Sequence, residues 1–82
     1  MLDWLEQAQR RLEADVEGAG DLSLSPADVE RLLELARVAA HESGERTNAP
    51  LVSYLVGLAQ GRNGSATLDE VVATALGDGS SL

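Results

Sequence analysis

The stretch that decides the fold is PLVSYLVGLAQ, residues 50–60, which is apolar on nearly every side. Only Ser53 and Gln60 in it are plainly polar. Pro50 suits an early helical position and Gly61 suits a helix end, so the pattern predicts a helix over residues 50–60 rather than a buried strand. A helix that is apolar nearly all round must be covered on most sides, and we therefore expect it at the centre of the fold.

The clearest start signal belongs to a helix predicted over residues 26–43. Ser25 is its expected N-cap, and Pro26 occupies the first helical position, where its missing N–H costs nothing. Leu24 and Val29 have the spacing of a hydrophobic staple. Gly44 follows the last turn, where a left-handed C-terminal cap is expected.

Two further helices complete the prediction, over residues 2–17 and 67–76. The first places Leu5, Leu12 and Val16 near one stripe, and the last opens with Thr67 and Glu70 at capping-box spacing. No segment alternates with the two-residue period of a strand. The sequence therefore predicts an all-α fold, an irregular four-helix bundle.

Length and charge limit the classes of protein that fit. Eighty-two residues allow one domain, expected over residues 1–77, with a disordered tail at 78–82. A net charge of −8 with no basic patch argues against nucleic acid and anionic membrane surfaces as partners. With no Cys, and no apolar stretch of signal or transmembrane length, we expect a cytoplasmic chain without disulfides or thiolate metal sites.

The chain reads LDWL at residues 2–5, LELARVAAH at 33–41, APL at 49–51 and YLVGLAQGR at 54–62. It thereby resembles an uncharacterised actinobacterial helical domain that occurs alone or attached behind a molybdenum-cofactor guanylyltransferase. The resemblance implies an accessory module connected with nucleotidyl transfer to molybdopterin, and it brings no catalytic residues. Guanylyl transfer needs a Gly-rich nucleotide loop and acidic metal ligands, which this sequence lacks, so the enzyme would be a different chain or domain.

Three basic side chains form a candidate anion site. Arg37 and His41 lie one turn apart near the end of the second predicted helix, and Arg46 precedes the third, whose N-terminus offers backbone N–H groups. The competing interpretation of His41 is structural, because a histidine in the last turn favours the negative end of its helix. His41 with Glu42 and Glu45 falls short of the ligand set of a structural zinc site, so no metal is predicted.

Two other classes match the sequence less well. Asp21-Leu22-Ser23 resembles the attachment site of an acyl carrier protein, but in carriers the modified Ser follows Asp directly and opens the second helix. Here Leu22 intervenes and the helix opens at Ser25. Helix-turn-helix DNA binding would require the apolar third helix to read bases within a negative field.

We therefore expect a protein without enzymatic activity or cofactor, whose function is association through the third helix. The expected interface consists of five residues of that helix: Leu51, Tyr54, Leu55, Gly57 and Leu58. A second copy and a nucleotidyltransferase are the two candidate partners. The alternative function is the binding of a small phosphate-bearing ligand at Arg37, His41 and Arg46, and a remote alternative is an acyl-carrier-like protein.

Overall fold

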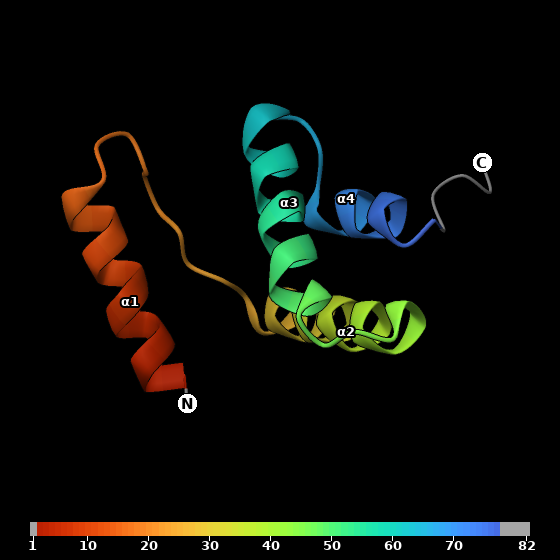
Figure 1. Ribbon diagram of the computed structural model, residues 1–82. Helices are drawn as coiled ribbons and strands as arrows, with labels where there is room; N and C mark the ends of the chain where they lie inside the picture. Colours follow the sequence, from red (N-terminus) through yellow and green to blue (C-terminus); the bar gives the residue numbers. More distant parts are fainter. Residues whose placement is uncertain (1, 78–82) are drawn as a thin grey trace.

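The computed structural model describes residues 2–77, with side chains from residue 4 onward, as four helices (Figure 1). These are α1 (Leu2–Asp15), α2 (Pro26–Ser43), α3 (Asn48–Arg62) and α4 (Leu68–Ala75). No strand occurs within residues 2–77, so the predicted all-α class with four helices is confirmed. The bounds of α2 match the prediction, α3 is longer by two residues at each end, and α1 and α4 are slightly shorter. The tail predicted at 78–82 lies outside the described residues.

The predicted capping box of α4 is present, and the predicted N-cap Ser25 of α2 is part of a second one. The backbone N–H of Asp28 donates to Ser25 Oγ at 3.0 Å, and the Ser25 N–H donates back to the Asp28 carboxylate at 3.1 Å. Thr67 and Glu70 make the same reciprocal pair at the start of α4, at 3.1 and 2.9 Å. These bonds satisfy amide groups that the first turn of a helix leaves without partners, which explains why α2 and α4 begin where they do.

Gly44 ends α2 in the predicted left-handed conformation, with φ of 76°. Its N–H donates to the carbonyl of Ala40 at 3.1 Å. A residue with a Cβ would be strained there, so glycine is what allows the chain to turn sharply into α3.

The core lies where α2, α3 and α4 meet (Figure 1). Each of these helices contributes one fully buried side chain: Leu35 from α2, Val56 from α3 and Val72 from α4. Five partly buried residues pack around the three: Leu32, Val52, Leu68, Val71 and Leu76. The core of the described chain is therefore small.

Helix α1 stands apart from this group (Figure 1). No Cα atom of α1 lies within 8 Å of a Cα atom of α2, α3 or α4. The irregularity of the four-helix arrangement is thus located in α1. The Cα radius of gyration is accordingly 13.4 Å, against about 12 Å for a compact chain of this length. The accessible surface is 6,291 Å², whereas a compact monomer of this mass exposes roughly 4,700 Å².

The segment between α1 and α2 is held to α1 by its own hydrogen bonds. Gly18 and Gly20 adopt positive φ values of 83° and 72° and let the chain turn back. The Leu22 N–H then donates to the Glu13 carboxylate at 2.6 Å. From there the segment continues without helix or strand to the N-cap of α2 at Ser25. We call residues 16–25 the linker.

Candidate functional site

The outer side of α3 carries an exposed apolar face. Leu51, Tyr54 and Leu55 are 61%, 68% and 59% exposed, whereas Val56 on the opposite side is 2% exposed. Together with the partly buried Leu58 they follow the i, i+3, i+4, i+7 spacing that marks one side of a helix. We call these four residues, Leu51, Tyr54, Leu55 and Leu58, the α3 face.

The expectation that the third helix would be covered on most sides is wrong for the single chain. Helices α2 and α4 cover the side that carries Val56, and no described helix packs over the α3 face. The physical reason is the position of α1, since the one remaining helix with an apolar stripe stands away. At the edge of the α3 face, Leu51 and Leu55 line a cavity together with Glu42 of α2. Of the five predicted interface residues, four form this face, and Gly57 is exposed at its edge, one turn after Tyr54.

Helix α3 itself is almost free of charge. Helix α3 has no acidic residue, and its one charged side chain is Arg62 in its last turn, although the chain as a whole has a net charge of −8. Gly57 and Gly61 leave room on this helix, because a Cβ built on either would meet no other atom within 4 Å. A second helix therefore meets neither a carboxylate nor a bulky side chain at these two positions.

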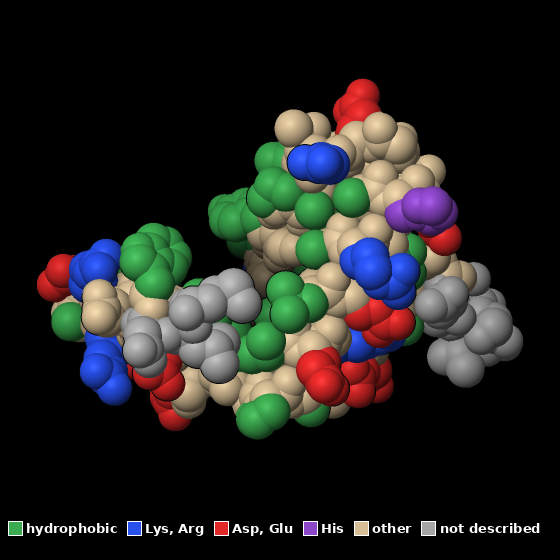
Figure 2. Space-filling view, turned by 90° about the horizontal axis from the view of Figure 1, so that it is seen from below, with side chains coloured by type: hydrophobic (Ala, Val, Ile, Leu, Met, Phe, Trp, Pro, Cys, Tyr) green, Lys and Arg blue, Asp and Glu red, His purple; other side chains and the backbone are tan. Residues whose placement is uncertain are grey.

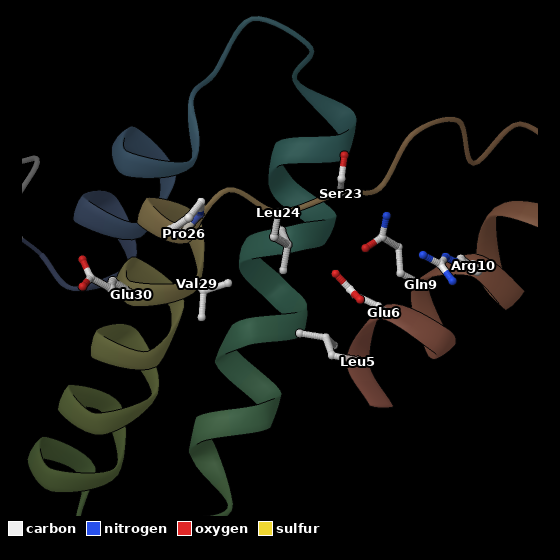
Figure 3. A pocket seen from close by; sticks show the side chains of 9 residues that line it. All are labelled: Leu5, Glu6, Gln9, Arg10, Ser23, Leu24, Pro26, Val29 and Glu30. Carbon is white, nitrogen blue, oxygen red and sulfur yellow. The ribbon is translucent and has the colours of Figure 1, made fainter. Parts of the chain in front are cut away.

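A hollow separates α1 from the helices α2 to α4, and hydrophobic side chains lie on both of its sides (Figure 2). One part of it is a cavity of about 600 Å³ between α1 and the start of α2. Leu5 points from α1 toward Leu24 of the linker and Val29 of α2 (Figure 3). Glu6, Gln9 and Arg10 line its α1 side.

Sequence reasoning missed this second apolar surface. It assigned Leu5, Leu12 and Val16 to the inner stripe of a packed helix, but all three are exposed. Leu24 and Val29, which the sequence predicts as a local staple, also line the hollow that α1 lines. The signal was present in the amphipathic stripe of α1, and what the stripe did not reveal was that no helix of the same chain packs against it.

The three residues of the predicted anion site are all exposed. Arg37 and His41 lie one turn apart on α2, and Arg46 lies in the turn before α3. Within the described part of the chain, none of these side chains makes a hydrogen bond or an ion pair. The structure gives no measure of ligand binding, so the site stays a prediction.

The N-terminus of α3 offers less to an anion than the sequence suggested. The N–H groups of Asn48 and Ala49 donate to the carbonyls of Glu45 and Arg46, each at 3.1 Å. Pro50 has no N–H. The first three positions of the helix therefore present no unused amide, and the positive side chains are what remains to favour a phosphate. A thermal-shift assay with GTP on the wild type and on Arg46→Ala checks this alternative.

The two serines considered for acyl-carrier chemistry both have local partners. Ser25 Oγ accepts the capping bond from Asp28. The Ser23 hydroxyl donates to Asp21 Oδ1 at 2.6 Å, and the Ser23 N–H donates to the same oxygen at 2.9 Å. The first of these bonds is the main cause, and the second a further cause, of a pKa of Asp21 below its ordinary value. Both hydroxyls thus have a role in local structure.

The described residues contain no group of three His, Asp or Glu side chains that could hold a metal ion. No described helix combines the length and the apolar character that crossing a membrane requires.

Comparison with known proteins identifies the family. Residues 1–80 match the model of a domain of unknown function, DUF6457. The chain therefore belongs to the DUF6457 family. No curated protein and no solved structure matched significantly.

Proposed function

We propose that this DUF6457 domain is a non-enzymatic association module that binds a protein partner through the α3 face. The observation that carries the proposal is the exposure of Leu51, Tyr54 and Leu55 side by side on a helix without acidic residues. Contiguous exposed apolar patches on small proteins often mark interaction sites, whereas single exposed apolar side chains are normal. The tyrosine fits the preference of interfaces for an aromatic ring with a polar tip.

Charge supports the same surface. A chain with a net charge of −8 repels other acidic proteins over most of its surface. The helices α1, α2 and α4 all carry carboxylates, and α3 carries none. The α3 face is therefore where an acidic or neutral partner approaches with the least repulsion.

The test is a double variant of the exposed face, Leu51→Gln with Tyr54→Gln. Because both side chains are exposed, the variant keeps the fold of the single chain, which circular dichroism checks. Leu33→Gln is the matched control: Leu33 is 60% exposed and lies two residues from the buried Leu35, on the outer side of α2. In sedimentation velocity at micromolar concentration, the wild type and the control form a complex heavier than 8.6 kDa, and the double variant does not. A wild type that stays at 8.6 kDa and binds no partner contradicts the proposal.

For a heterologous partner we propose a molybdenum-cofactor guanylyltransferase. The support is the resemblance of residues 2–5 and 33–62 to domains attached to such enzymes, and the α3 face lies within the second of these ranges. Titration calorimetry of the guanylyltransferase encoded in the same genome tests it, with the double variant as control. No heat from the wild type at tens of micromolar protein rules this partner out and leaves self-association in place.

A further inference from the structure

We infer that the α3 face is covered by helix α1 of a second copy, so that two chains exchange their first helices across the hollow. The inference rests on the proposed function, because it names the occupant of the same surface. It follows from four observations, on α1, on α3, on the linker and on the exposed area.

Helix α1 needs a partner. It has 14 residues, and isolated helices of about 12 to 15 residues are only marginally stable in water. Leu5 and Leu12 of the helix and Val16 at the start of the linker form one apolar stripe, and all three are exposed. No Cα atom of another helix within the described chain comes within 8 Å to stabilise it.

Helix α3 offers the matching surface. It has 15 residues, so the two helices have nearly the same length, about 21 and 22 Å. Helix α1 carries the acidic side chains of Glu6, Glu13 and Asp15. Helix α1 also carries Arg10 and Arg11, so its net charge is still negative, and α3 is the helix of the described chain that has no carboxylate to repel it.

The linker favours a second copy over the same chain. The bond from Leu22 N–H to Glu13 joins the linker to α1, and the two bonds from Ser23 to Asp21 lie within the linker. To keep these bonds while α1 folds back onto its own α3, the chain must bend sharply between Ser23 and the N-cap of α2 at Ser25. Exchange keeps them, and it creates the same contact twice because a two-fold axis repeats each interface.

The exposed area is sufficient for a stable dimer. The chain exposes 6,291 Å², roughly 1,600 Å² more than a compact monomer of its mass. A standard stable interface buries about 800 Å² on each partner. Exchange of α1 therefore needs about half of the surplus, and the α1 stripe and the α3 face both offer exposed apolar side chains for it.

Single cysteines test the exchange, because the chain has none of its own. Ala8→Cys places a thiol on the α1 stripe and Leu55→Cys places one on the α3 face. The two variants are mixed in equal amounts at micromolar concentration and treated with a short bis-maleimide. The expected product contains one chain of each variant, identified by mass spectrometry. Leu33→Cys replaces Leu55→Cys in the control mixture, and no product that joins it to Ala8→Cys is expected.

Three results overturn the exchange, and they differ in what they say about the proposed function. If the wild type is a dimer and Leu55→Cys links only to a second Leu55→Cys, α3 packs on α3, so association stands and exchange fails. If the wild type is a dimer and Leu55→Cys links neither to itself nor to Ala8→Cys, the interface lies elsewhere, which contradicts both the exchange and the proposed function. A double variant, Ala8→Cys with Leu55→Cys, that links within one chain and sediments as a monomer shows α1 closed over its own α3. That result also contradicts both.

Discussion

Helices α1 and α4 are both amphipathic, yet they lie in opposite environments. Helix α4 has only eight residues, but it begins with a capping box and places Val72 wholly in the core. Helix α1 has 14 residues and a longer apolar stripe, but none of its described side chains is buried. Length and pattern therefore do not decide whether a helix belongs to the core. What differs is the connection, since a short turn joins α4 to α3 and a hydrogen-bonded linker holds α1 away.

The largest difference in stability is expected when one leucine is truncated in each region. Leu35→Ala removes a fully buried side chain and should lower the free energy of unfolding by about 2–5 kcal/mol at every protein concentration. Leu12→Ala, half exposed in α1, should lower the melting temperature only at concentrations where the dimer forms, because its packing partner is then another chain. Thermal unfolding followed by circular dichroism over a hundredfold concentration range measures both.

Equal losses for Leu35→Ala and Leu12→Ala at the lowest concentration would contradict the contrast, since they would place α1 in the same cooperative unit as α2 to α4. Val72→Ala is the second core variant, in case Leu35→Ala does not fold. Its loss should be smaller, because fewer carbon atoms are removed.

The capping box of α2 is the next test. Ser25→Ala removes the oxygen that accepts the Asp28 N–H and should cost about 1 kcal/mol. Ser23→Ala, two residues earlier in the linker, is the control and should leave the unfolding of α2 to α4 unchanged. Urea unfolding at low protein concentration measures the difference. Equal losses from the two variants would mean that the linker and α2 unfold together.

Gly57→Ala separates the single chain from the complex. No atom lies within 4 Å of the added methyl group, so the substitution should stabilise the single chain by roughly 0.5–1 kcal/mol through helix propensity. It should weaken association, because Gly57 borders the α3 face. Unfolding at low concentration and sedimentation at high concentration give the two results. If Gly57→Ala increases both the stability of the single chain and the strength of association, Gly57 lies outside the interface.

The smallest expected effect concerns pH and the linker. The hydrogen bonds from Ser23 lower the pKa of Asp21 below its ordinary value of 3.8. A lowered folded pKa means that the contribution of Asp21 to linker order is complete above the ordinary value and is lost as the pH falls through the folded one. Carboxyl NMR titration should show this pKa rising toward 3.8 in Ser23→Ala. No change in that variant would assign the lowered pKa to other groups.

The sequence predicted best where a local rule fixes the chain. The bounds of α2 follow from Ser25, Pro26 and Gly44, which act within one turn of each helix end. The start of α4 follows from Thr67 and Glu70 in the same way. Helix α3 begins two residues earlier than predicted, because the turn carbonyls of Glu45 and Arg46 accept the first two N–H groups.

Contacts beyond one helical turn were harder to predict. The bond from Leu22 to Glu13 spans nine residues and holds the linker against α1, and no motif indicates it. The stripe of α1 predicts that this side of the helix packs against another surface. A periodic pattern does not say whether that surface belongs to the same chain. The α3 face could be predicted as an interface from composition alone. A helix that is apolar on most sides has more apolar surface than three small neighbouring helices can bury.

The small core has a consequence for how much folded protein a cell contains. With Leu35, Val56 and Val72 as its wholly buried side chains, the described chain draws little stability from its own interior. Whatever binds the folded form then supplies a large part of the total by mass action. The folded fraction should rise steeply with the level of expression, and copies made in excess of their partners should be the first that proteases remove.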